Sequence, residues 1–143
     1  MNEGCGDYSL NHNTTRLLVK KIYARKEKMV REKVTKIMID IGIPASLKGY
    51  HYIIDAILMV IANQETILQL GKSIYTDIAK EYNTNVEAVE RDIRTAIEKV
   101  TKTGNIDKIY EIFGNTINPD KGKPTNKEFI ATIAYKIKLE MNM

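Results

Sequence analysis

Apolar residues recur every three or four positions along most of this chain, which is the spacing of one face of an α-helix. A first helix is predicted from Thr14 or Thr15 to Ile41, where Gly42 ends it. Its more regular apolar stripe lies in the C-terminal half, which should pack on the core. The apolar positions of this helix are Leu18, Ile22, Met29, Val30, Val34, Ile37, Met38 and Ile41. Residues 1–13 are polar and contain two glycines, and we interpret them as a disordered lead.

The rest of the chain shows the same helical spacing in shorter segments, and a break is expected at Gly71. The predicted helices are 47–63, 66–70, 73–82, 85–103, 106–113 and one that starts after Thr125. Ser46 is predicted to cap the first of these, which carries a wide apolar stripe and should be the central core helix. Thr125 and Glu128 have the spacing of a capping box, in which each side chain accepts a hydrogen bond from the other residue's backbone. No alternating strand pattern competes, so the predicted fold class is all-α.

Two of these helices are joined by a turn of about three residues, 83–85. In the first helix, Ile78 and Ala79 lie on the inner face, and the small Ala79 permits a close crossing. The second helix is anchored from beneath by Val86, Val89, Ile93, Ala96 and Ile97. Thr84 and Glu87 again have capping-box spacing and are predicted to fix where the second helix begins. This is the spacing of a helix-turn-helix, whose second helix lies in the major groove of DNA.

With its apolar positions turned inward, the second helix presents a polar outer face. The residues left for that face are Asn85, Glu87, Ala88, Glu90, Arg91, Arg94 and Thr95. Arg91 and Arg94 are one turn apart, and each can reach a guanine edge bidentately or clamp a phosphate. Glu90 can accept from a cytosine amino group or hold an arginine in position. The alternative is a solvent-exposed helix on which Glu87–Arg91 and Glu90–Arg94 are ordinary ion pairs.

The net charge of +4 is unevenly distributed along the chain. Residues 1–33 carry eight basic and four acidic side chains, whereas residues 34–143 carry fourteen of each. Nucleic-acid binding by the C-terminal part therefore requires a local basic face rather than a total positive charge. The basic half of the first helix could be a solvated face, a DNA-backbone contact or a membrane-surface segment.

Other chemistry has little support in the sequence. One cysteine, Cys5, and two histidines, His12 and His51, do not make a plausible zinc site, and no metal or other cofactor is expected. Glycine-rich phosphate loops and G-x-S-x-G elbows are missing, so an enzyme is not predicted. The longest apolar run, 56–62, is too short for a membrane span, and the N-terminus has no export-signal pattern. These features favour a cytoplasmic protein, which the predicted DNA binding would place on the nucleoid.

Four segments together resemble a known family. They are IGIPASLKGYHYIIDAI (41–57), YTDIAKEYNTNVEAVERDIRTAIE (75–98), TGNIDKIYEIFG (103–114) and KPTNKEFIATIAYKIKLE (123–140). They are similar to the DNA-binding effector domain of stage-zero sporulation protein A, the master response regulator of endospore-forming bacteria. The resemblance covers about residues 34–143, with the segments in register.

The resemblance implies a compact bundle of about six helices with an embedded helix-turn-helix, here preceded by a basic helix extension. It implies recognition of a DNA box containing TGTCGAA, often in tandem copies that could hold a homodimer, and activation or repression of transcription. The family's V-E-R-x-I-R segment, which contacts the box, corresponds to Glu90, Arg91 and Arg94. A contact with the RNA polymerase sigma factor would fall around residues 103–113.

Three departures from the family pattern affect what is expected. About 33 residues stand where the family has a phosphoacceptor receiver domain, so control by aspartate phosphorylation is not expected. Thr95 stands where the family commonly has histidine, and Asp92 where a small residue is usual. An extra carboxylate near phosphates is expected to alter affinity or box preference. The basic helix at 16–33 has no counterpart in the family.

The sequence thus predicts a lead and helix extension over 1–33, and a DNA-binding effector domain over 34–143. The expected function is that of a sporulation-type transcription regulator that binds its box without receiver phosphorylation. Expected base contacts are Glu90, Arg91, Arg94 and Thr95, and candidate backbone contacts are Asn85, Lys72, Lys80, Lys99 and Lys102. One alternative is an antagonist that occupies boxes without activating. Another is a protein-interaction or membrane-interaction module that uses the 16–41 helix.

Overall fold

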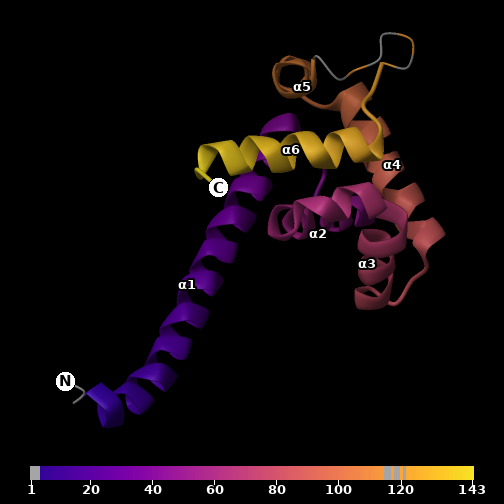
Figure 1. Cartoon of the computed structure of the whole chain (residues 1–143). Helices are drawn as coiled ribbons and strands as arrows, with labels where there is room; N and C mark the ends of the chain where they lie inside the picture. Colours follow the sequence, from indigo (N-terminus) through magenta and orange to yellow (C-terminus); the bar gives the residue numbers. More distant parts are fainter. Residues whose placement is uncertain (1–3, 115–116, 118–119, 121) are drawn as a thin grey trace.

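A computed structural model describes residues 4–114, 117, 120 and 122–143. These residues form a helical bundle, and no strand occurs among them (Figure 1). The elements are α1 (Gly4–Ile41), α2 (Lys48–Ala62), η1 (Gln64–Gln69), η2 (Leu70–Ile74), α3 (Tyr75–Glu81), α4 (Val86–Thr103), α5 (Ile106–Phe113) and α6 (Asn126–Glu140). The predicted all-α fold class is therefore confirmed.

The centre of the bundle is α2, as its wide apolar stripe predicts. It packs most extensively against α4 and α6, and it also contacts α1, α3 and η1. Ile53 and Ile57 of α2 are completely buried. Burial of each such side chain contributes about 1.5–3 kcal/mol to folding. The central helix is thus the support on which the helices of the candidate site are placed.

Gly49 allows α2 and α4 to come very close together. A Cβ atom at Gly49 would lie 2.1 Å from the backbone oxygen of Asp92 and 2.9 Å from the Cβ of Ala96. Real Cβ atoms do not tolerate such distances, so only glycine fits at this crossing. The crossing fixes how far α4 stands from the core.

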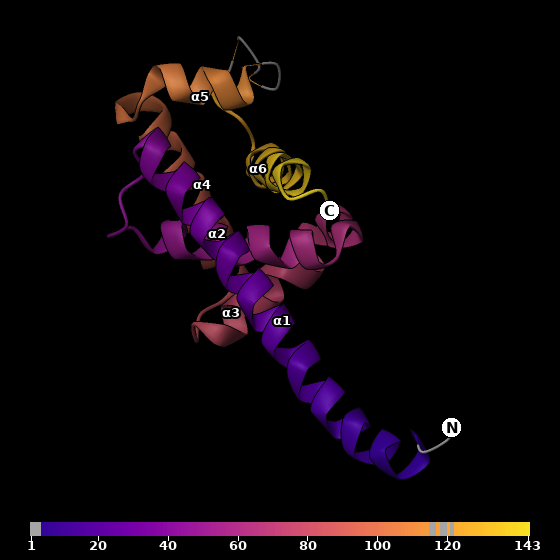
Figure 2. The same ribbon diagram turned by 90° about the vertical axis from the view of Figure 1, so that its left-hand side faces the viewer.

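The long helix α1 has two different parts. Its C-terminal turns pack on the bundle, where Val34, Met38 and Ile41 are fully buried. Its N-terminal turns extend away from the rest of the molecule in both views (Figures 1 and 2). Leu18, in the N-terminal half, and Met29 are each 53% exposed, so Met29 does not take part in the packing predicted for the C-terminal half of the stripe. Met29 is exposed although the next residue, Val30, is buried, because Met29 faces away from the bundle. The side chain of Ile22, another of the apolar positions, lies outside the described side chains.

The predicted disordered lead is also corrected, because α1 begins at Gly4 rather than at residue 14 or 15. Extending an existing helix by one residue adds a hydrogen bond without a new nucleation step. A polar segment free of proline can therefore continue a helix that is already nucleated further along. The division of the chain at residue 33 stays a prediction.

The helix starts show which capping predictions hold. The Thr125–Glu128 box is confirmed: the Glu128 N–H donates to Thr125 Oγ1 at 3.1 Å, and the Thr125 N–H donates to Glu128 Oε1 at 2.9 Å. The prediction that Ser46 caps α2 is wrong, because the N-cap residue is Leu47. The Leu47 N–H donates to Pro44 O at 3.2 Å in the turn that precedes the helix.

The region between α2 and α3 differs from the predicted pair of helices with a break at Gly71. A 3₁₀ segment, η1, passes directly into a π-helical turn, η2, and the chain then continues as α3. Gly71 lies inside the π turn, where its carbonyl oxygen accepts a hydrogen bond from Thr76 Oγ1 at 3.3 Å. Periodicity does not distinguish such a widened turn from a helix end.

Among the helices that the structure describes, none has both the length and the apolar character needed to cross a membrane.

Candidate nucleic-acid interface

The helices α3 and α4 are joined by the tight turn that the sequence predicts. Asn83 adopts a left-handed conformation with φ 53°, which asparagine tolerates better than most residues. The Thr84 N–H donates to Ala79 O at 2.8 Å and closes the turn. Ile78 and Ala79 are buried, as predicted, so α3 presents its small residue where α4 approaches. The geometry is that of a helix-turn-helix.

The start of α4 is fixed by Asn85 rather than by Thr84 and Glu87. Asn85 is the flanking residue, and its Oδ1 accepts a hydrogen bond from Ala88 N at 2.8 Å. The predicted Thr84–Glu87 box is therefore wrong, because the helix begins one residue later than that box requires. A short amide side chain satisfies the same free N–H groups.

The inner face of α4 is apolar and nearly inaccessible. Val89, Ile93, Ala96 and Ile97 are buried, as predicted, and Val86 is half-buried at the first turn. Because the buried positions occupy one side of the helix, the polar residues of the other side face outward. Arg91, Arg94 and Thr95 are exposed there, whereas Glu90 is half-buried beside α6.

Arg91 is the most available of the predicted base contacts. Its side chain is 61% exposed, and its Nε lies 3.6 Å from Asp92 Oδ1. Arg91 therefore pairs with the carboxylate of Asp92 and not, as the alternative interpretation expected, with that of Glu87. Exposed pairs of this kind are worth about 0–1 kcal/mol, so the guanidinium can leave Asp92 at little cost.

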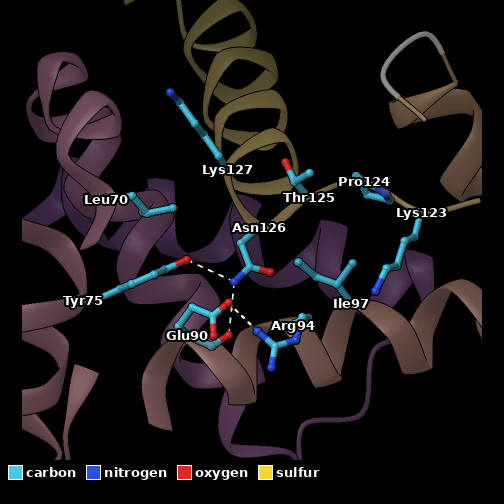
Figure 3. A pocket seen from close by; sticks show the side chains of 10 residues that line it. All are labelled: Leu70, Tyr75, Glu90, Arg94, Ile97, Lys123, Pro124, Thr125, Asn126 and Lys127. Carbon is cyan, nitrogen blue, oxygen red and sulfur yellow. Dashed lines mark hydrogen bonds and ion pairs between the residues drawn. The ribbon is translucent and has the colours of Figure 1, made fainter. Parts of the chain in front are cut away.

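Arg94 is held more firmly, because its Nη1 donates to Glu90 Oε1 one turn earlier (Figure 3). The hydrogen bond to Glu90 raises the pKa of Arg94 further above its ordinary value. The Glu90–Arg94 ion pair of the alternative interpretation is therefore present. It also agrees with the suggestion that Glu90 holds an arginine in position.

A pocket beside this pair lies between α4 and the start of α6. It is lined by Leu70, Tyr75, Glu90, Arg94, Ile97, Lys123, Pro124, Thr125, Asn126 and Lys127 (Figure 3). Asn126 Nδ2 donates to Tyr75 Oη at 3.1 Å and to the backbone oxygen of Glu90 at 3.1 Å. Sequence reasoning missed Asn126 and Tyr75, because no spacing rule connects residues so far apart in the chain. The only signal was the Thr125–Glu128 box, which places Asn126 in the first turn of α6.

A second contact ties the segment before α6 to α4. Lys123 Nζ donates to Glu98 Oε2 at 2.6 Å. The hydrogen bond and charge of Lys123 lower the pKa of Glu98 below its ordinary value. Glu98 is thus a paired carboxylate on the outer side of α4.

The C-terminal end of α3 is tied to the central helix. Tyr82 Oη donates to Asp55 Oδ2 at 2.6 Å, and the rings of Tyr82 and Tyr52 form a T-shaped contact with centroids 4.9 Å apart. Burial and the Asp55 carboxylate raise the pKa of Tyr82 to about 12. Both helices of the helix-turn-helix are therefore tied to other elements, α3 through Tyr82 and α4 through Glu98.

The candidate backbone contacts lie on several elements. Lys72 is in η2, Lys80 in α3, and Lys99 and Lys102 in α4, and all four are exposed. Asn85 is also exposed, although its side-chain oxygen is engaged in capping. Lys102 is eleven residues beyond Arg91, which is about three helical turns and places both on the outer face.

The segment 103–113, for which the family resemblance implies a sigma-factor contact, is partly core. Ile109 and Phe113 of α5 are buried, and Phe113 stacks on Phe129 of α6 with ring centroids 4.8 Å apart. Ile106 and Tyr110 are exposed on the other side of the helix. Any contact with another protein would therefore use only one face of α5.

The helix-turn-helix, its buried anchors and the exposed arginines of α4 define a DNA-binding domain. Residues 34–137 match the family model described as Sporulation initiation factor Spo0A C terminal. The chain belongs to this family, whose members are DNA-binding effector domains that regulate transcription in sporulation. The resemblance stated from the sequence is confirmed.

Proposed function

We propose that this protein binds a TGTCGAA-like box with α4 in the major groove. Glu90, Arg91, Arg94 and Thr95 read base edges in this proposal. The observation that carries it is the outward position of Arg91 and Arg94 on a helix whose other side is anchored in the core. An arginine can bond a guanine bidentately, which is the commonest specific contact in the major groove.

The two arginines have different roles in the proposal. Arg91 is mobile enough to leave Asp92 and engage a base. Arg94 is pre-oriented by Glu90, so less side-chain freedom is lost when it binds. Asp92, a carboxylate near the DNA, weakens phosphate approach and shifts the box preference away from that of relatives with a small residue there.

Backbone contacts surround the base-reading centre. Lys72, Lys80, Lys99 and Lys102 provide exposed ammonium groups for phosphates, and they strengthen binding without regard to sequence. Asn85 keeps its amide nitrogen as a donor while its oxygen caps α4. The positive end of the α4 dipole lies at the same place and favours a phosphate there.

Binding by these 143 residues does not depend on a phosphorylated receiver in this proposal. The support is that the whole helix-turn-helix is assembled from the described helices, and that each of its two helices is tied to other elements. Tandem boxes would bring two copies together as a homodimer on DNA. The exposed face of α5 around Tyr110 would meet the sigma factor, and the protein would reside in the cytoplasm on the nucleoid.

A second candidate function is favoured by the shape of α1. Its basic N-terminal turns project from the bundle (Figures 1 and 2) and could dock on a partner protein or an anionic membrane. Binding that survives Arg91→Ala but is lost on deleting residues 1–33 would identify this module. A box-occupying antagonist is distinguished by a reporter gene, whose output it lowers and an activator raises.

Replacing Arg91 by alanine tests the base-reading assignment. Arg91→Ala is expected to weaken binding to the box by about 1–3 kcal/mol and to relax sequence preference. Fluorescence anisotropy with a box duplex and a scrambled duplex measures both effects. Arg25→Ala, which removes the same group from the exposed part of α1, is the matched control and should leave the preference unchanged. Wild-type behaviour of Arg91→Ala on both duplexes would contradict the assignment.

A further inference from the structure

The first residue of α6 contacts both helices of the helix-turn-helix. Asn126 Nδ2 lies 3.1 Å from Tyr75 Oη, at the start of α3, and 3.1 Å from the backbone oxygen of Glu90 in α4. Figure 3 shows the amide between these two acceptors, with the Glu90–Arg94 pair directly below it. One side chain of the C-terminal helix therefore touches both elements of the DNA-binding motif.

We propose that Asn126 is a positioning residue, which sets the placement of Glu90 and Arg94 on α4 and thereby the specificity of the box contact. The proposal rests on the proposed function, because it concerns how the recognition helix is held. Asn126 acts through Glu90 and Arg94 and does not itself read a base.

The contact with Glu90 requires a hydrogen-bond donor, and the amide of Asn126 supplies one. The Glu90 acceptor is a backbone carbonyl oxygen, so only an N–H or O–H group can bond to it. The asparagine NH₂ has two hydrogens and can serve Glu90 and Tyr75 together. Tyr75 is buried at the start of α3, and this burial raises the pKa of its phenol.

The position of Asn126 is fixed by a stiff element. The Thr125–Glu128 capping box defines the first turn of α6, and Phe129, Ile130 and Ile133 bury the next turns in the core. Asn126 is thus held at a defined height above α4. The Lys123–Glu98 hydrogen bond adds a second tie from the same segment, two turns further along α4.

Glu90 transmits this position to the recognition face. Its backbone is held by Asn126, and its carboxylate holds Arg94. A shift of α4 at Glu90 therefore moves two predicted base contacts together. Small displacements of this kind are enough to spoil hydrogen bonds to base edges, whereas phosphate contacts by flexible lysines adapt to them.

The test compares Asn126→Ala with the wild type in the full chain. The ratio of affinities for box and scrambled duplexes should fall roughly fivefold to tenfold, the range that one lost hydrogen bond covers. Affinity for the scrambled duplex should change little. Asn105→Ala is the matched control, because it removes another asparagine side chain that makes a hydrogen bond, in this case by accepting from Lys108 N at the start of α5. It should cost comparable stability and keep the ratio.

Two further variants separate positioning from general stability. Tyr75→Phe removes one acceptor but leaves the bond to Glu90, so it should keep most of the ratio. In an Arg94→Ala background, Asn126→Ala should have a smaller effect on the ratio than in the wild type, since one of the two residues it positions is gone. An undiminished effect there, or an equal loss on both duplexes, would overturn the proposal.

Amide hydrogen exchange tests the positioning role of Asn126 independently of DNA binding. Asn126→Ala should accelerate exchange in the first half of α4, around the Arg94 amide, more than in α2. If the wild type itself shows no box preference, the proposed function fails, and the exchange data alone decide the role of Asn126. Unchanged exchange in α4 would then overturn the positioning role.

Discussion

The side chains on the outer side of α4 differ in how tightly they are bonded to neighbouring residues. Arg91 has only a loose contact with Asp92, whereas Arg94 is tied to Glu90 and Glu98 is tied to Lys123. The looser group can reorganise on binding, and the tied groups are already ordered. This gradation follows from which residues have a partner one turn away or on the segment before α6.

The Glu98–Lys123 contact gives a prediction about pH. We expect the pKa of Glu98, followed by NMR through its carboxyl carbon, to lie below 4.5 in the wild type and to rise toward that value in Lys123→Gln. A folded-state pKa below the unfolded one adds stability at higher pH. That stability is lost as the pH falls through the folded-state value.

Lys127→Gln is the control for this titration, because it removes another ammonium group near the same pocket. It should leave Glu98 nearly unchanged. A Glu98 titration that does not respond to Lys123→Gln would show that the hydrogen bond does not persist in solution.

Residue-level prediction succeeded where a rule of spacing applied. The inward residues of α4 and the Thr125–Glu128 box follow from helical periodicity and capping chemistry, and both are found. The Asn126 bridge could not be predicted, because it depends on how α6 lies over α3 and α4. The roles of Glu90, Arg91, Arg94 and Thr95 in DNA binding stay predictions.

At the scale of elements, the placement of α4 depends on its crossing with α2. The backbone of Asp92 approaches Gly49 so closely that no side chain fits between the helices. Asp92 is next to Arg91, so the crossing sets the height of the recognition face above the core. Packing and DNA recognition are linked at this point.

Replacing Gly49 by alanine tests this crossing. Gly49→Ala is expected to destabilise the fold by about 1–3 kcal/mol or more, since α2 and α4 must separate to admit the methyl group. Urea unfolding followed by far-UV circular dichroism measures the free energy of unfolding. Gly71→Ala is the matched control, because a Cβ there meets no described atom within 4 Å. Its effect should stay within about 0.5 kcal/mol. Equal stability of the two variants would show that the close crossing is not formed.

Element boundaries were predictable where capping and turn residues mark them. The predicted helix 106–113 agrees with α5, and α6 begins directly after Thr125 as expected. The π turn at η2 and the early start of α1 were not predicted. In both places a helix continues where the sequence predicts its end: at η2 it continues past Gly71, and at α1 it continues into the polar N-terminal segment. The spacing of apolar residues gives no signal for such continuation.

The whole molecule separates a projecting basic helix from a recognition helix set into the bundle. In Figure 1 the N-terminal part of α1 extends to the lower left, whereas α4 lies at the right. The excess positive charge belongs to the first 33 residues, so total charge does not report on the recognition face. Binding that comes only from the basic helix would be insensitive to sequence and would weaken steeply with salt.

The most direct test of the central claim is fluorescence anisotropy of a TGTCGAA duplex against a scrambled duplex at low and high salt. The account predicts tighter binding to the box and a preference that persists at high salt, because base contacts do not depend on released counterions. Equal binding to both duplexes that disappears with salt, or no binding to either, would contradict it.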